Sequence, residues 1–211
     1  MSKIKEIAAA VEGGKLKLIE GLVNEALEAK EDPTAILEEG MIAAMSVIGA
    51  KFQANEVFVP EMLVSARAMK KGVEVLRPHL AGDVVGKQGK FIIGTVAGDL
   101  HDIGKNLVAL MVESAGFEVI DLGVDVSAEK FVEALKENPD CKIVGASALL
   151  TTTMGALEET VKAIVSAGYR DKVKIMVGGA PVTQAFADKI GADVYSPDAG
   201  SAAIDALKLV Q

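Results

Sequence analysis

Residues 91–106 read FIIGTVAGDLHDIGKN, and this stretch decides the fold class. It begins with a β-branched and aromatic run over 91–97, which favours a buried strand, and after a polar turn helical spacing resumes over 107–115. Similar runs recur with amphipathic helical segments between them, at 118–122, 142–147, 174–177 and, more weakly, 193–195. Five strands that alternate with helices predict a doubly wound, parallel five-stranded sheet of the Rossmann or flavodoxin type.

The amino-terminal part of the chain has a different period. Apolar residues over 4–81 recur at spacings of three and four, which is typical of amphipathic helices. Gly13-Gly14 separates a first helix from a second, and Asp32-Pro33 supplies an N-cap and an N1 proline for a third. Pro60-Glu61 opens a fourth helix. The pattern predicts an all-α four-helix bundle.

These two patterns define the expected domains. We expect a helical domain over residues 1–82 and an α/β domain over residues 90–211. Residues 83–89 are glycine-rich and have no sustained period, so we expect them to form a linker.

The composition excludes several kinds of partner. The net charge of −8 opposes binding to nucleic acid or to an anionic membrane surface, because both need clustered basic residues. No apolar run reaches the roughly 18–20 residues that span a bilayer, and the amino terminus lacks the apolar core of a signal peptide. Cys141 is the only cysteine, which excludes an internal disulfide and fits a reducing compartment. We therefore expect a cytoplasmic protein with no nucleic acid or membrane partner.

A histidine lies between two carboxylates in the loop after the first strand, where Asp99, His101 and Asp102 are crowded together. Ligands of doubly wound sheets bind at the carboxyl ends of the strands, so this loop is a candidate site. A metal-bound imidazole works best when its other nitrogen donates to a carboxylate, and Asp99 can accept that bond. Gly104 would let a bulky planar ligand approach the backbone. A solvated loop histidine is the alternative interpretation.

Asp99, His101 and Gly104 match the Asp-x-His-x-x-Gly signature of cobalamin-binding domains. The chain resembles this family, which includes methionine synthase, adenosylcobalamin mutases and the small corrinoid proteins of methyltransferase systems. The resemblance implies a cofactor that is cobalamin or a related corrinoid, alternating between methylcob(III)alamin and cob(I)alamin. It also implies that His101 is the lower axial ligand of cobalt.

The loop after the third strand carries a second part of the resemblance. Ser147 and Leu149 match the family's Ser-x-Leu pattern, and further hydroxyl residues follow. The resemblance implies that Ser147 and Thr151 line the slot for the cofactor's nucleotide tail. It also implies that Thr153 hydrogen-bonds Asp99 and extends a His101-Asp99-Thr153 relay. A hydroxyl-rich N-cap for the following helix is the alternative for this loop.

Further matches extend the resemblance over nearly the whole chain. Gly178-Gly179 matches the paired glycines that leave room for the tail, and Tyr195 lies in a loop similar to the one that closes over it. Phe52 and Val59 match apolar positions in the helical segment that covers the upper cofactor face in methionine synthase. A place in the core of the helical bundle is the alternative for both residues. The resemblance implies these cofactor-contacting residues: Asp99, His101, Asp102, Ile103, Gly104, Ser147, Leu149, Thr151, Thr153, Gly178, Gly179, Tyr195, Phe52 and Val59.

The order of domains is similar to that of the small corrinoid protein of a three-component methyltransferase system, in which a helical cap precedes a cobalamin domain. The resemblance implies a methyl carrier that is not catalytic by itself. A substrate-specific methyltransferase would methylate cob(I)alamin on this chain, and a second methyltransferase would pass the methyl group to tetrahydrofolate or a thiol. A reductive activator is a further implied partner.

Three alternatives remain open from the sequence. The chain could be the cobalamin subunit of an adenosylcobalamin-dependent mutase, although such subunits lack the helical bundle. It could be a cobalamin-sensing regulator, although it has no basic DNA-binding segment, or a flavodoxin-like protein with an unrelated ligand. The methyl donor also stays open among methanol, methylamines, betaines and methoxylated aromatics.

Overall fold

The computed structural model describes residues 2–80 and 88–210. The chain divides between Lys87 and Gln88 into two compact units, which we describe one at a time. Most of the linker expected at 83–89 lies outside the described residues, so its role stays a prediction. Within the described ranges, no helix combines the length and the apolar character needed to cross a membrane.

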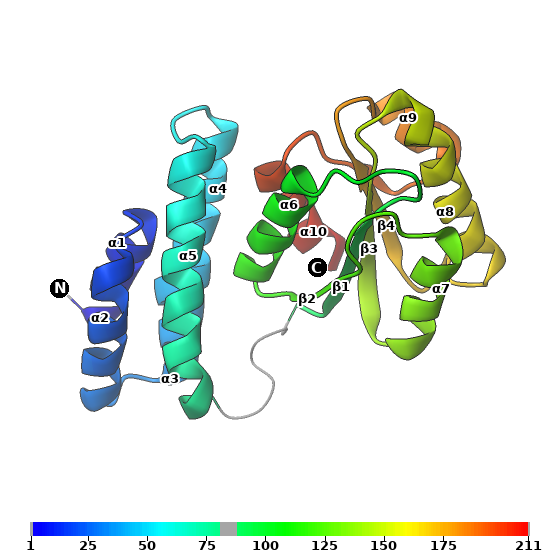
Figure 1. The fold of residues 1–211 in the computed structure, drawn as a ribbon. Helices are drawn as coiled ribbons and strands as arrows, with labels where there is room; N and C mark the ends of the chain where they lie inside the picture. The colour runs from blue at the N-terminus through cyan, green and yellow to red at the C-terminus, as the bar shows by residue number, and fades with distance from the viewer. Residues whose placement is uncertain (1, 81–87, 211) are drawn as a thin grey trace. The chain divides into compact units, whose positions relative to one another are not determined.

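The first unit is entirely helical (Figure 1). Its elements, in chain order, are α1 (Lys3–Glu12), α2 (Leu16–Glu28), α3 (Pro33–Ala35), the π-helix η1 (Ile36–Ile42), α4 (Ala43–Gln53), α5 (Val59–Leu76) and the short 3₁₀ turn η2 (Arg77–His79). The elements α3, η1 and α4 follow one another without a break and together form the third predicted helix. The four-helix prediction is therefore confirmed, whereas the π-helical stretch was not expected from the spacing.

Local signals explain where these helices begin. The Asp32 carboxylate accepts hydrogen bonds from the backbone N–H groups of Thr34 (3.4 Å) and Ala35 (3.2 Å) and so caps α3. The Glu61 carboxylate accepts from the backbone N–H of Phe58 at 2.7 Å at the start of α5. The apolar stripes of these helices meet in a core formed mainly by Ile7, Val11, Ile19, Val23, Met41, Met62 and Met69.

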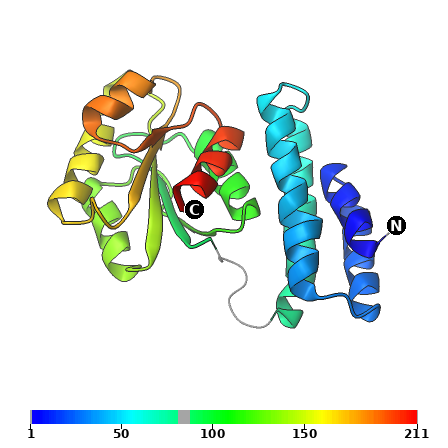
Figure 2. The same cartoon turned by 180° about the vertical axis from the view of Figure 1, so that it is seen from behind.

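The second unit is a parallel five-stranded sheet between two layers of helices, as predicted. Its strands are β1 (Lys90–Thr95), β2 (Glu118–Asp121), β3 (Cys141–Ser147), β4 (Lys174–Gly178) and β5 (Val194–Tyr195), in the spatial order β2-β1-β3-β4-β5. Its helices are α6 (Ile103–Ser114), α7 (Ala128–Glu137), η3 (Thr151–Thr153), α8 (Met154–Ser166), α9 (Gln184–Ile190) and α10 (Ala199–Val210). Figures 1 and 2 show α7, α8 and α9 on one face of the sheet and α6 and α10 on the other.

Alternating strand residues build the core on both faces of the sheet. Ile92, Val144 and Ile175 belong to one buried cluster with residues of α7 and α8, while Phe91 packs edge-on against Phe117 at 6.1 Å between ring centroids. Cys141 is also buried, and burial raises the pKa of its thiol to about 11. The thiol therefore stays protonated and has a structural role.

The strand order places the candidate loops together. Strand β1 pairs with β2 on one side and with β3 on the other, so chain order reverses around β1. Ligands of doubly wound sheets bind beyond the carboxyl ends of strands at such a switch point. The loops that follow β1 and β3 are the ones that carry the predicted site residues.

Candidate functional site

His101 lies in the loop between β1 and α6, with its ring held on one side only. Its Nδ1 lies 2.6 Å from Oδ1 of Asp99, a carboxylate with no exposed surface, whereas the His101 side chain is 49 % exposed. Among the described residues, Nε2 has no hydrogen-bond partner. An imidazole whose Nδ1–H donates to a carboxylate keeps the lone pair on Nε2, so the ring can coordinate a metal ion through that atom.

Asp99 is the centre of a hydrogen-bond network that joins two loops. Its Oδ2 accepts from the Thr153 hydroxyl at 2.8 Å and from the backbone N–H of Leu149 at 2.7 Å. Burial alone would raise the pKa of the Asp99 carboxyl, but hydrogen bonds from Leu149, His101 and Thr153 lower this pKa far below its usual range. Asp99 is therefore an ionised, fixed acceptor for the imidazole.

Thr95 and Ser147 form a second hydrogen-bonded chain, which holds the backbone of His101 in place. The Thr95 hydroxyl donates to the carbonyl of His101 at 2.9 Å and lies 3.0 Å from the Ser147 hydroxyl. Since Thr95 has a single hydroxyl proton, Ser147 is the donor between the two. Thr95 and Ser147 are register partners at the carboxyl ends of β1 and β3. Thr95 was missed in the sequence, although a hydroxyl residue at the end of a buried strand could have pointed to it.

Exposed aliphatic side chains lie close to the site residues in the chain. Leu100, in the loop after β1, is 71 % exposed, and Ile103, the first residue of α6, is 84 % exposed. Leu149 and Leu150 are 42 % and 41 % exposed in the loop after β3. Exposed aliphatic residues that gather at one place mark a surface for an apolar partner. Ile103 and Leu149 were predicted, whereas Leu100 and Leu150 were missed, although each adjoins a predicted residue.

The residues present fit a corrinoid. A free imidazole nitrogen, exposed aliphatic side chains close to it in the chain and open space where a Gly104 side chain would stand suit a flat, largely apolar macrocycle with a metal ion at its centre. Across the described ranges, no group of three or more His, Cys, Asp or Glu side chains could hold a metal ion by itself. The cobalt of a corrinoid brings most of its ligands with it, so a single imidazole is enough protein ligand for such a metal.

Three further predicted residues lie near this edge in other roles. The Asp102 carboxylate accepts from the Asn106 side-chain amide at 3.2 Å and so braces the start of α6. Thr151 is exposed in the short helix η3. Tyr195, at the end of β5, is half-buried and packs against the sheet core. Their predicted contacts with the cofactor stay predictions.

At the end of β4, the protein's own backbone requires glycine at Gly179 and leaves little room for a side chain at Gly178. Gly179 has φ +121°, and a Cβ at that position would collide with the backbone carbonyl of Ala148. A Cβ at Gly178 would lie 3.1 Å from the carbonyl oxygen of Ser196. Room for the cofactor's tail was the predicted reason for these glycines, and the structure adds a second reason that needs no ligand.

Phe52 and Val59 belong to the helical unit. Phe52 is half-buried near the end of α4, and Val59 is 38 % exposed at the first position of α5. The two units are described separately, so the predicted contact of these residues with the upper face of the cofactor stays a prediction.

A doubly wound sheet with a carboxylate-held imidazole and exposed aliphatic side chains at its carboxyl edge defines a protein of the cobalamin-binding class. The comparisons with known proteins agree. Residues 89–208 match a family model described as the B12 binding domain, and residues 3–77 match a second model with the same description. The chain belongs to the family of B12-binding corrinoid proteins.

Relatives match over almost the full chain. "Dimethylamine corrinoid protein 1" of Methanosarcina mazei is 42 % identical over 98 % of this chain and 95 % of its own length. "Trimethylamine corrinoid protein 2" of Methanosarcina acetivorans is 48 % identical over 89 % of this chain and 85 % of its own length. A chain of the methanol:cobalamin methyltransferase complex MtaBC from Methanosarcina barkeri superimposes with a TM-score of 0.87 at 29 % identity, over 99 % of this chain and 79 % of that one.

Proposed function

We propose that this chain carries a methyl group on a bound corrinoid between two methyltransferases, with His101 as the lower axial ligand of cobalt. One observation carries the ligand assignment: the exposed ring of His101 is fixed through Nδ1 by the buried Asp99 carboxylate, 2.6 Å away, with Nε2 left free. The family and the relatives named corrinoid proteins support the carrier role. When bound, the corrinoid supplies the cobalt centre that carries the methyl group.

The protein's part is to hold, orient and shield that centre. The Asp99 carboxylate keeps the Nδ1 proton on the imidazole and leaves Nε2 as the donor atom. Asp99 would hold the imidazole in the same orientation whether or not Nε2 is bound to the metal. Thr153 keeps Asp99 in place at 2.8 Å throughout. Leu100, Ile103 and their neighbours would exclude water from the lower face.

The relatives favour a methylated amine as the methyl source. Those named after dimethylamine and trimethylamine are 42 % and 48 % identical to this chain, whereas the chain of the methanol complex is 29 % identical. We therefore propose that the first partner is a methylamine methyltransferase. The second methyltransferase, with tetrahydrofolate or a thiol as acceptor, the reductive activator and the cytoplasmic location are also parts of this proposal.

The ligand assignment is tested by His101→Ala in protein loaded with methylated cobalamin. We expect the visible absorption bands to move to those of a corrinoid without an imidazole ligand, and methyl transfer to slow. Circular dichroism of the apoprotein checks that the fold is kept. A wild-type absorption spectrum in the variant would reject His101 as the ligand.

The methyl source is tested by demethylated, reduced holoprotein mixed separately with methyltransferases for trimethylamine, dimethylamine, monomethylamine and methanol. Each mixture receives its own methyl donor. We expect methylation of the bound corrinoid with an amine-specific enzyme and little with the methanol enzyme. Faster methylation with the methanol enzyme would reject the amine assignment and leave the ligand assignment intact.

A further inference from the structure

The start of the loop that carries His101 is hydrogen-bonded to the segment 121–125, which comprises the last residue of β2 and the turn after it. The backbone N–H of Gly98 donates to the Asp125 carboxylate at 2.7 Å, and the backbone N–H of Asp125 donates to the carbonyl of Asp99 at 3.0 Å. A bridge between Val96 and Val126 adjoins these bonds. Asp125, which was not among the predicted site residues, therefore holds the backbone of Gly98 and Asp99 through hydrogen bonds.

Asp125 holds this position in an unusual backbone conformation. Its φ is +52°, in the left-handed region that few residues other than glycine adopt, although aspartate tolerates it better than most. Residues in this region persist where surrounding contacts hold them, and they concentrate at functional sites. Here the contacts that hold Asp125 are the two hydrogen bonds to the His101 loop.

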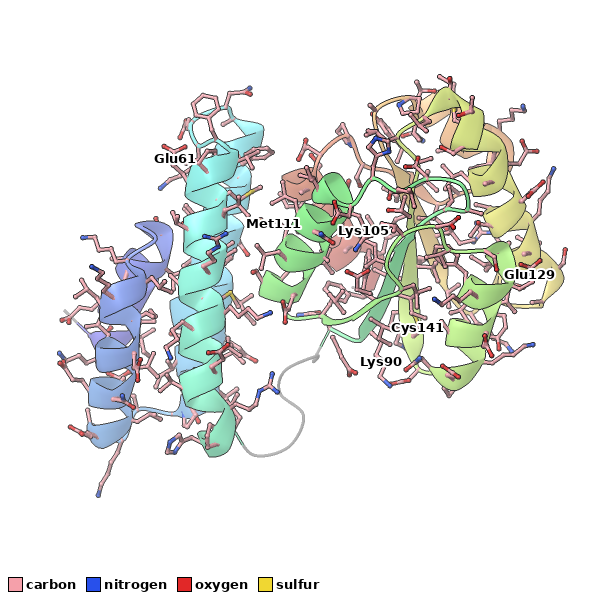
Figure 3. All side chains as sticks on the ribbon, viewed as in Figure 1. Glu61, Lys90, Lys105, Met111, Glu129 and Cys141 are labelled. Atoms are coloured by element: carbon pink, nitrogen blue, oxygen red, sulfur yellow. The ribbon has the colours of Figure 1, made fainter. Side chains whose placement is uncertain are left out.

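The same segment fastens the end of the loop through a buried lysine. Lys105 lies at the start of α6, on the side that faces the strands, and its side chain is 2 % exposed (Figure 3). Its Nζ donates to both carboxylate oxygens of Asp121, at 2.6 and 2.5 Å, and to Oδ1 of Asn106 at 2.6 Å. All three ammonium protons are thus used, as a buried lysine requires.

The carboxylate that binds Lys105 is itself held in place. Oδ1 of Asp121 also accepts the backbone N–H of Gly123 at 2.9 Å, so the carboxylate is tied to its own turn. His101 lies between the two fastening points, four residues before Lys105 and three after Gly98. Neither Lys105 nor Asp125 makes a hydrogen bond to the imidazole in the described residues, so their hydrogen-bonded link to His101 runs through the loop backbone.

We propose that the segment 121–125 positions the cobalt ligand, with Asp125 and the Lys105–Asp121 pair as positioning residues at the two ends of the His101 loop. The inference rests on the proposed role of His101. A loop held at both ends presents its imidazole at one height and angle, so little ordering is needed when the ring meets cobalt. Outer partners of metal ligands change metal affinity by about 10–100-fold when they are removed.

The test uses full-length protein loaded with methylated cobalamin and compares Lys105→Met and Asp125→Gly with the unmodified chain. Methionine keeps the length of the lysine stem without its three donors, and glycine keeps the positive φ of Asp125 without its carboxylate. We expect each variant to raise the cofactor Kd by about 10-fold or more and to lower the fraction of protein with the imidazole-bound absorption spectrum. Asp125→Asn, which keeps an acceptor oxygen, should recover most of both losses.

Arg170→Met is the matched control for lost stability. It breaks a pair of similar type, in which Arg170 donates to both carboxylate oxygens of Asp193 at 2.9 Å, at the amino ends of β4 and β5. We expect this control to unfold at lower urea concentration while its spectrum and cofactor Kd stay unchanged. Equal spectral changes in the control and in the two test variants would overturn the inference.

His101→Ala separates the inference from the proposed function. If His101→Ala changes the spectrum while Lys105→Met and Asp125→Gly keep both the wild-type spectrum and the wild-type Kd, the positioning role is wrong and the ligand assignment stands. If His101→Ala itself keeps the wild-type spectrum, the ligand assignment is wrong, and the positioning role that rests on it is wrong as well. Should Lys105→Met not fold, Asp125→Gly decides the outcome, because Asp125 is exposed and its removal leaves no buried charge.

Discussion

The Thr153 hydroxyl lies 2.8 Å from Oδ2 of Asp99, although the two residues are 54 positions apart in the chain. The bond joins the loops that follow β1 and β3, which are neighbours in the sheet but not consecutive in sequence. The same hydroxyl also approaches the carbonyl of Leu150 at 2.9 Å, so it is fixed relative to its own turn. This contact extends the His101–Asp99 pair into a hydrogen-bonded chain of three residues, fixed at its Thr153 end.

Removal of the Thr153 hydroxyl should destabilise the protein. A hydrogen bond to a charged group contributes about 1.5–3 kcal/mol and a buried methyl group about 0.8 kcal/mol, so we expect Thr153→Ala, which removes both, to lower the free energy of unfolding by about 2–4 kcal/mol. Urea unfolding of the apoprotein measures the change. Thr153→Ser keeps the hydroxyl and should lose only the methyl contribution, about 0.8 kcal/mol. Equal losses in both variants would show that the bond to Asp99 contributes nothing.

The exposed leucines should matter for binding and not for folding. Leu100 is 71 % exposed, so Leu100→Ser should change the free energy of unfolding by no more than about 0.5 kcal/mol. Loss of its apolar contact with the corrinoid should cost about 1.5 kcal/mol, or roughly tenfold in cofactor Kd. Titration of apoprotein with cobalamin measures Kd. Val165→Ser, at a 43 % exposed position on α8, is the control and should leave Kd unchanged.

The substitution Gly104→Ala should have opposite effects on apoprotein stability and on cofactor affinity. It lies in the first turn of α6 with open space where a Cβ would stand, so Gly104→Ala should stabilise the apoprotein by up to about 1 kcal/mol through helix propensity. The added methyl group should weaken cofactor binding, because it occupies space that the corrinoid would need. Thermal unfolding of the apoprotein and cobalamin titration check the two effects. Tighter binding by this variant would contradict the assigned position of the macrocycle.

Gly179→Ala should destabilise the apoprotein, in contrast to Gly104→Ala. The collision of its Cβ with the Ala148 carbonyl and the φ of +121° should destabilise the apoprotein by about 1–3 kcal/mol or more. Urea unfolding without cofactor measures this loss. A stable apoprotein that fails only in cobalamin binding would show that room for the tail is the dominant reason for this glycine.

Asp193 should contribute to acid sensitivity. Burial alone would raise its pKa, but hydrogen bonds from Arg170 and the backbone N–H of Ile175 lower it below the usual value. A carboxyl whose pKa is lower in the folded chain stabilises fully above the unfolded pKa, about 3.9, and loses this contribution as the pH falls through the folded pKa. We expect Asp193→Asn to be less stable than the unmodified protein in urea at pH 6, with the gap narrowing near pH 3. A gap that does not depend on pH would contradict this assignment.

Much of the fold and the centre of the site could be predicted from sequence because they depend on local patterns. The run at 91–97 had to form a strand, and its polar end had to lie at the same sheet edge as the end of 142–147, because parallel strands bring their carboxyl ends together. Asp99 and His101 are two positions apart, so their contact needs no long-range information. The Asp-x-His-x-x-Gly pattern then indicated the class of cofactor.

What the sequence did not reveal depends on which distant segments become neighbours. Lys105 is typical of an exposed helix position until β2 places Asp121 beside it, and Thr95 is an ordinary strand residue until pairing with β3 brings Ser147 within 3.0 Å. The exposure of Leu100 was not evident from the sequence either, because sequence patterns predict apolar residues to be buried and only tertiary packing decides which of them are not. The sequence by itself determined the elements, the loop and the class of cofactor, whereas the tertiary structure decided which side chains form hydrogen bonds to that loop, because those partners come from distant segments.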